Sequence, residues 1–402
     1  MAGGSGDLGT QPVAAAHPKT QAPPRPAEGI ELIGEYKGSG FKETPYLVKR
    51  ADGQVVQLPK LLYLVAERID GRRSYEDISE EVSEELQAGL GPEDVAYLVA
   101  EKLAPLGVAA GPEGTPGEIQ SADPLLALRF KKAVVPKGLV RAVTSVFFPL
   151  FFLPILVGAV VGLAILDFWM FGSHGIAQSL RATIFDPSLL LALFGVVVVT
   201  AAFHECGHAT GCRYGGAEPG VMGVGLYLVW PAFYTDLTDT YRLGKWGRLR
   251  ADLGGVYFNT LFVLATAGLY FLTHFEPLLI VILLLQLEIL VQFMPFLRMD
   301  GYYMVADVTG VPDLFARIGA IFKSLIPWRE ADPRVKELKT WVRVVVTAWV
   351  LIVVPVLLFN LAMIVISAPR IFSTAWTSLT SGSENLIAPV VVRPTSPLCT
   401  SR

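Results

Sequence analysis

The sequence predicts an α-helical protein that crosses a membrane about five times and carries an N-terminal cytoplasmic α+β domain of winged-helix-like type. Hydrophobic residues make up 52 % of the 402 residues and charged residues 17 %, with a mean hydropathy of +0.49. A soluble domain carries about 25 % charge. The apolar residues gather into long runs from about residue 143 onward, whereas residues 30–111 combine short strand-like and helical patterns.

The N-terminal end carries little structural signal. Residues 1–29 are rich in Gly, Ala and Pro and contain no apolar core of signal-peptide length, so we expect a disordered tail. The three cysteines form no CxxC pair, so we expect neither a disulfide framework nor a redox motif.

Residues 30–111 show the order β-β-α-α-α, which is typical of a small winged-helix-like domain. Two strand-like runs, Tyr46–Lys49 and Val55–Leu58, flank an Asp-Gly turn signal. Three helical patterns follow, and they begin at Lys60, after the capping pair Ser74 and Asp77, and at Pro92.

The charge of this domain argues against DNA binding, the first function that such a fold suggests. Residues 30–111 hold 15 Asp and Glu against 9 Lys and Arg, whereas a phosphate backbone requires the opposite balance. We therefore expect no nucleic-acid partner and favour peptide or protein binding. A packing domain without a ligand is the alternative.

A linker and basic juxtamembrane segment, residues 112–142, precedes the membrane domain, residues 143–368, and residues 369–402 form a C-terminal tail. Each predicted span is long enough for a hydrocarbon core of about 30 Å. The five spans are expected at residues 143–166, 188–211, 252–273, 277–297 and 342–367. Residues 219–234 are apolar but broken by Gly and Pro, which predicts a hairpin or a re-entrant segment that lines a cavity.

Basic residues alternate between the predicted loops. The segment before the first span and the loops after the second and fourth spans are rich in Lys and Arg. The loop after the first span holds only Arg181, and the loop after the third span holds no basic residue. Because basic loops stay in the cytoplasm, we expect the N-terminal domain inside and the C-terminal tail outside.

The strongest motif is His204-Glu205-Cys206-Gly207-His208, near the end of the second span. Histidines four residues apart lie on one helix face, so both imidazoles can reach one zinc ion, and the Glu between them can take a proton from water. Zinc lowers the pKa of water to about 7. Ionisable residues in a span are usually functional; polar side chains that cap a helix end are the alternative.

A catalytic zinc needs a third protein ligand and one open position. Of the remaining histidines, His17 lies in the predicted tail, while His174 and His274 fall on the outer side. Asp300, at the end of the fourth span, falls toward the same cytoplasmic face as the HExxH motif and is the best candidate. An ordinary Asp-Gly turn at a helix end is the alternative.

A membrane HExxH motif followed by Pro-x(4)-Asp-Gly at the end of a later span resembles the site-2 protease family of intramembrane zinc metalloproteases. The match runs through Pro295, Asp300 and Gly301 and covers the second to fourth spans, about 110 residues. The resemblance implies one Zn²⁺ per chain, held by His204, His208 and Asp300. It also implies hydrolysis of a peptide bond in or near the membrane.

Two further positions resemble parts of the family that contact substrate. Asn259 ends the Gly-rich run that begins at Gly254, and this motif implies a hydrogen bond to the tetrahedral intermediate or to the substrate backbone. A polar contact between helices is the alternative for Asn259. Gln292 stands where the family carries an Asn that binds or orients substrate.

The run Asp300-Gly301-Tyr302-Tyr303 and the loop at residues 230–236 resemble a bacterial subgroup of peptide zinc metalloproteases. Residues 30–111 resemble PqqD-like domains, which hold precursor peptides. These resemblances imply a bacterial inner or plasma membrane, a peptide or membrane-protein substrate, and a precursor peptide that the cytoplasmic domain captures and the membrane core cuts.

Two alternatives belong to other classes of protein. A membrane di-iron hydroxylase or desaturase needs more than the five histidines present. A non-catalytic peptide-binding subunit for peptide maturation or export, with a degenerate protease core, is the second alternative. The intact HExxH motif and Asp300 argue against this reading, whereas Gln292 leaves room for it.

Overall fold

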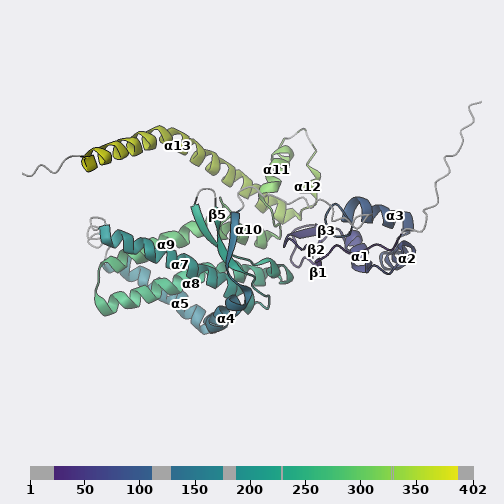
Figure 1. The fold of residues 1–402 in the computed structure, drawn as a ribbon, viewed down its shortest axis with the longest axis horizontal. Helices are drawn as coiled ribbons and strands as arrows, with labels where there is room; N and C mark the ends of the chain where they lie inside the picture. The colour runs from purple at the N-terminus through teal and green to yellow at the C-terminus, as the bar shows by residue number, and fades with distance from the viewer. Residues whose placement is uncertain are drawn as a thin grey trace, which may run out of the picture. The chain divides into compact units, whose positions relative to one another are not determined.

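Figure 1 shows the computed structural model, which describes residues 22–110, 128–174, 187–227, 230–326, 328 and 330–387. The chain forms two compact units, Met1–Val346 and Thr347–Arg402. Most of the predicted tail at residues 1–29, the first part of the predicted linker at residues 112–142 and the last part of the predicted C-terminal tail lie outside the described residues.

The first unit begins with a three-stranded antiparallel sheet followed by helices. Its elements are β1 (Glu31–Glu35), β2 (Tyr46–Lys49), β3 (Val55–Leu58), α1 (Lys60–Arg68), α2 (Tyr75–Leu86), α3 (Pro92–Tyr97) and the π-helical turn η1 (Leu98–Leu103). The two expected strands and the three expected helix starts are confirmed. The sequence analysis missed β1, which pairs with β2.

One hydrophobic core holds this domain together. Val48 and Leu58 from the sheet pack with Ile78, Val82 and Leu103 from the helices, and all five are fully buried. Burial of each such side chain contributes roughly 1.5–3 kcal/mol. The described end of the predicted tail is ordered against the same domain through backbone hydrogen bonds with the chain after η1.

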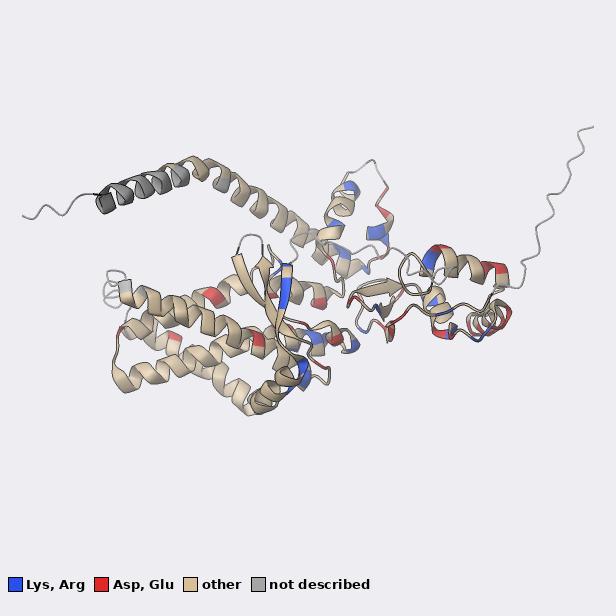
Figure 2. Ribbon diagram, in the orientation of Figure 1, with Lys and Arg blue, Asp and Glu red and all other residues tan. Residues whose placement is uncertain are grey.

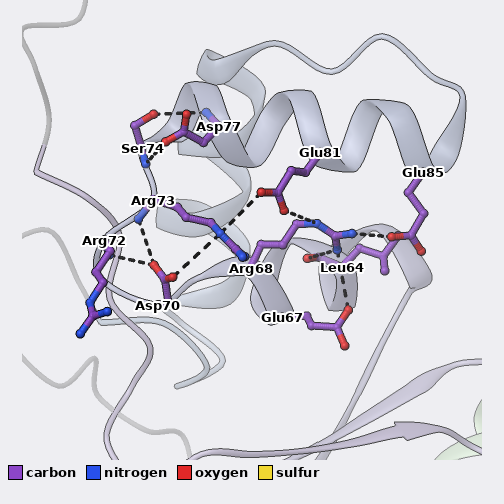
Figure 3. A network of polar contacts seen from close by, with 10 residues as sticks. All are labelled: Leu64, Glu67, Arg68, Asp70, Arg72, Arg73, Ser74, Asp77, Glu81 and Glu85. Atoms are coloured by element: carbon purple, nitrogen blue, oxygen red, sulfur yellow. Dashed lines mark hydrogen bonds and ion pairs between the residues drawn. The ribbon is translucent and has the colours of Figure 1, made fainter.

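Ion pairs and a helix cap fix α1 against α2 (Figure 3). Arg68, at the end of α1, pairs with Glu81 and Glu85 of α2. The Ser74 hydroxyl accepts a hydrogen bond from the Asp77 backbone N–H at 3.2 Å, and the Asp77 carboxylate accepts one from the Ser74 N–H at 2.9 Å. This is the expected capping box, and it sets where α2 begins.

Long apolar helices make up most of the remaining chain. They are α4 (Lys137–Phe147), α5 (Leu153–Trp169), α7 (Pro187–Tyr214), α8 (Lys245–Thr273), α9 (Pro277–Gln292) and α13 (Thr340–Ile387). Four described segments are long and apolar enough to cross a membrane: Leu153–His174, Leu191–Tyr214, Lys245–Thr273 and Thr340–Pro369. The remaining expected span, the fourth at residues 277–297, corresponds to α9, a shorter apolar helix that ends at Gln292.

The first expected span, residues 143–166, is divided into two helices. α4 ends at Phe147, the 3-10 turn η2 (Phe148–Phe151) follows, and α5 begins at Leu153. Pro149 and Pro154 account for the break, because proline lacks the backbone N–H that a helix interior needs but is tolerated in a first turn.

A second antiparallel sheet stands beside the helices. Its strands are β4 (Arg129–Val135), β5 (Met222–Tyr227) and β6 (Trp230–Thr235), in the order β4-β5-β6. The hairpin expected within residues 219–234 is confirmed as β5 and β6, whereas β4 was not expected. β6 also packs against α7.

Short elements connect the long helices. They are the 3-10 turns η4 (Thr238–Arg242) and η5 (Phe315–Arg317), the helices α10 (Asp300–Thr309), α11 (Ile318–Ser324) and α12 (Pro333–Lys336), and the π-helical turn η3 (Met170–His174). Asp300 is therefore the first residue of a separate helix and not the end of a span. The helix α8 packs against α5, α7, α9 and α10, so it lies at the centre of the helical part.

Candidate metal centre

The two histidines of the HExxH motif face one point beside α7. His204 and His208 are buried one helical turn apart, which places them on one face of the helix. The two Nε2 atoms are 3.0 Å apart. The spacing in the sequence therefore produces the convergence of imidazoles that was expected.

Asp300 completes a group of three potential ligands. One of its oxygens lies 3.1 Å from His204 Nε2 and the other lies 3.3 Å from His208 Nε2. Tetrahedral ligands about 2.0–2.1 Å from an ion are roughly 3.3 Å from one another. The ligand atoms all lie within 4.8 Å of one another, so this buried group could hold a metal ion.

The hydrogen bonds of the imidazoles suit this role. His208 Nδ1 lies 2.8 Å from the backbone oxygen of Ala251 in α8. Because a carbonyl only accepts, Nδ1 carries the proton and Nε2 presents its lone pair to the centre. His204 Nδ1 is buried without a hydrogen-bond partner among the described residues.

Glycines bring α7 and α8 close enough to form the site. A Cβ atom on Gly207 would collide with the backbone oxygen of Gly254 and with the ring of Phe258. A Cβ atom on Gly255 would collide with Nε2 of both histidines. The glycines of the HExxH motif and of the Gly-rich run therefore permit the helix contact that the metal centre needs.

The electrostatics of Asp300 suit a metal ligand. Burial alone would raise the pKa of this carboxyl group, but protonated His208 and His204 beside it, in the absence of a metal ion, hold the pKa well below its usual value. A bound metal ion, which would replace the imidazole protons, would favour the ionised carboxylate in the same way because it is also positively charged. A carboxyl group must be deprotonated to bind a metal ion.

Glu205, the residue after His204, contacts β6. Its Oε2 accepts a hydrogen bond of 2.7 Å from the Thr235 hydroxyl. The same hydroxyl lies 3.2 Å from the backbone oxygen of Glu205. Thr235 belongs to the loop at residues 230–236 that the sequence analysis noted, but its contact with Glu205, 30 residues earlier in a helix, carries no sequence signal.

The two other candidate residues lie farther along the helices. Asn259 is fully buried in α8, one turn after Gly255, and neither amide atom has a partner among the described residues. Gln292 is half-buried as the last residue of α9. The structure thus unites the three expected ligands, but it gives Asn259 and Gln292 no contact with them that defines a role.

The chain was compared with protein-family models, with curated proteins and with solved structures, and none of the three comparisons found a match.

Proposed function

We propose that the protein is an intramembrane zinc metalloprotease of the site-2 protease type. The observation that supports this most strongly is the convergence of His204, His208 and Asp300 from two separate helices, with Glu205 in the same motif. Two neutral imidazoles and one carboxylate are a ligand set that zinc prefers in hydrolases. The apolar helices around the group support a site at membrane depth.

Bound zinc would supply a Lewis acid that polarises a carbonyl group and acidifies water. In this proposal His204, His208 and Asp300 hold the ion. Glu205 takes a proton from the attacking water and then gives it to the leaving amine. Asn259, a buried amide one helical turn after Gly255, donates a hydrogen bond to the substrate or to the developing oxyanion.

The sheet beside α7 offers a way to hold a substrate. Among the described residues, β6 pairs only with β5, and its last residue contacts Glu205. An extended segment that added to the free edge of β6 would run toward the catalytic carboxylate. The acidic domain at residues 30–111 would capture a precursor peptide or a membrane protein before cleavage.

The proposed location is a bacterial inner or plasma membrane with the N-terminus in the cytoplasm. Figure 2 agrees with this orientation, because the long helices α5, α7, α8 and α9 are largely free of Lys and Arg, whereas β4 and the helix ends beside it carry several. Basic segments of this kind remain on the cytoplasmic side.

The test compares wild-type protein with Glu205→Gln after purification in detergent. We expect about one zinc per chain in both proteins and cleavage of peptide or membrane-protein substrates only by the wild type. His204→Ala should lose both zinc and cleavage. Zinc in both proteins, with no difference in cleavage, would instead support a non-catalytic peptide-binding subunit.

A further inference from the structure

Arg248 is a buried cation outside the metal centre. It is the largest fully buried side chain among the described residues, with 1 % exposure. Its Nε donates a hydrogen bond of 2.9 Å to Asp307 in α10, and its Nη1 donates to the backbone oxygens of Lys37 and Leu243 at 3.0 and 2.9 Å. A buried guanidinium is costly unless it is paired in this way, so Arg248 fixes three segments of the chain to one another.

One of these segments belongs to the N-terminal domain. We call residues 36–42, the first part of the connection between β1 and β2, the docking segment. Its Tyr36 is fully buried, and the Arg248 guanidinium lies 4.5 Å from the centre of the tyrosine ring. The Gly40 N–H donates to the backbone oxygen of Gly310, the residue after α10, at 3.1 Å. The docking segment therefore holds the C-terminal end of α10.

The other end of α10 is the metal ligand Asp300. Arg248 lies about two helical turns before Gly255 in α8, and Asp307 lies about two turns after Asp300 in α10. Gly255 faces the metal-binding imidazoles, which Asp300 also contacts. The helices α8 and α10 are thus joined at two positions about two helical turns apart. One is the metal centre and the other is the ion pair between Arg248 and Asp307.

We propose that Arg248 is a positioning residue for the metal centre: through Asp307 and the docking segment it holds α10 so that Asp300 meets His204 and His208. This inference rests on the metal centre of the proposed function. It adds that the N-terminal domain, through residues 36–42, is part of what keeps the third ligand in place.

The construction of α10 makes such support necessary. This helix has only 10 residues, and the chain between α9 and α10 has no regular secondary structure. Ligand distances must hold to about 0.2 Å for a strong metal site. Because a helix moves as a rigid body over so short a length, a displacement at Asp307 is transmitted to Asp300.

The test measures metal binding by the full-length protein in detergent. Zn²⁺ affinity is obtained by competition with a chelator, and the absorption spectrum of added Co²⁺ reports the ligand geometry. We expect Arg248→Gln and Asp307→Asn to weaken Zn²⁺ binding at least tenfold, as loss of groups that orient ligands commonly does, and to change the Co²⁺ spectrum.

Gly40→Ala tests the same idea without removing a charge. A Cβ atom at Gly40 would collide with the backbone oxygen of Thr309 at the end of α10, so this variant should also weaken Zn²⁺ binding. If Arg248→Gln does not fold, the Zn²⁺ affinities of Gly40→Ala and Asp307→Asn test the positioning role instead. Arg242→Gln is the matched control, since Arg242 pairs with Glu31 of the N-terminal domain and with Asp239 but not with α10. It should bind Zn²⁺ within twofold of wild type.

The outcomes separate this inference from the proposed function. Variants that melt at a lower temperature but keep wild-type Zn²⁺ affinity and Co²⁺ spectrum would show that Arg248 only stabilises the fold, and would overturn the positioning role. A wild-type protein that binds Zn²⁺ but cleaves nothing would overturn the protease alone. A wild-type protein that binds neither metal would overturn both.

Discussion

At the scale of single residues, Thr235 holds the proposed catalytic carboxylate in one orientation. Its hydroxyl donates to Glu205 Oε2 at 2.7 Å, which leaves Oε1 free to exchange a proton with water or with a leaving amine. A hydrogen bond to a charged group contributes about 1.5–3 kcal/mol. The strand β6 thus supplies both the proposed substrate edge and the contact that orients Glu205.

Thr235→Val should reduce kcat by about tenfold, because the nearly isosteric side chain cannot donate to Glu205. Zinc content should not change, since Thr235 does not contact the three ligands. Thr235→Ser keeps the hydroxyl and should retain most of the activity. Peptide-cleavage kinetics on the three proteins check this, and equal kcat values for Val and Thr would exclude an orienting role.

The residues of the site differ in how far the sequence could predict them. His204 and His208 follow from helical spacing alone, and Asp300 followed from the depth at which the fourth expected span ends. The Ala251 oxygen that fixes the tautomer of His208 comes from a helix 43 residues away, and its residue type carries no signal. Contacts made by backbone atoms or by strand ends need the fold before they can be found.

At the scale of elements, the contact between α7 and α8 is as important as the ligands themselves. Gly207 of α7 and Gly254 of α8 are in contact at the helix crossing. A side chain at either position would collide with the backbone of the other helix and push the two helices apart. The helix separation sets the distance between the His208 imidazole and the Ala251 oxygen that orients it. Small residues at such crossings are typical of helices packed in membranes.

Gly207→Ala should destabilise the protein by about 1–3 kcal/mol, the usual range for overpacking, and should lose most of the bound zinc. Gly268→Ala, in α8 with open space around its Cβ position, is the matched control and should melt and bind zinc like wild type. Thermal melting in detergent and zinc analysis measure both effects. Full zinc retention by Gly207→Ala would contradict the proposed tight crossing.

The cap of α2 gives the N-terminal domain a dependence on pH. Hydrogen bonds from the backbone and the hydroxyl of Ser74 hold the pKa of Asp77 below its usual value of 3.8. A lowered pKa in the folded state means that the stabilisation is present above the unfolded pKa and is lost as the pH falls through the folded value. The loss is therefore expected below about pH 4.

Hydrogen exchange of the full-length protein can measure this. Ser74→Ala should speed exchange of the α2 amides about fivefold at neutral pH, which corresponds to about 1 kcal/mol for a lost cap, while α3 serves as the internal reference. Wild-type α2 should lose protection as the pH falls below about 4, and Asp77→Asn should show a smaller change. An identical pH response in both proteins would assign it to other groups.

Some helices and strands could be predicted from sequence patterns, and others could not. Ser74 with Asp77 and Pro92 marked helix starts correctly, because caps are local chemistry. The apolar run at residues 143–166 read as one helix, although Pro149 divides it. β4 was missed because it becomes a strand only by pairing with β5, about 90 residues later, which hydrophobic periodicity does not record. β1 was missed although its partner β2 is the next strand along the chain.

At the scale of the whole molecule, α9 decides how many times the chain crosses the membrane. Its 16 residues extend about 24 Å at 1.5 Å per residue, less than the roughly 30 Å of a hydrocarbon core. Yet the chain must return from Thr273, at the far end of α8, to Asp300 beside the α7 imidazoles. α9 and the seven-residue connection before Asp300 together cover that distance, so we propose that α9 is a crossing.

In the topology that we propose, α9 is included and the chain crosses five times, and an odd number places the two termini on opposite sides. A green fluorescent protein fused before Met1 should fluoresce in the cytoplasm, and an alkaline phosphatase fused after Arg402 should be active outside it. The basic residues between α9 and α13, among them Arg317 and Lys336, favour the same arrangement. Fluorescence from a fusion after Arg402, with an inactive phosphatase at the same position, would mean that the chain crosses an even number of times. In that case α9 would be a re-entrant helix, and Asp300 would reach the histidines without a fifth span.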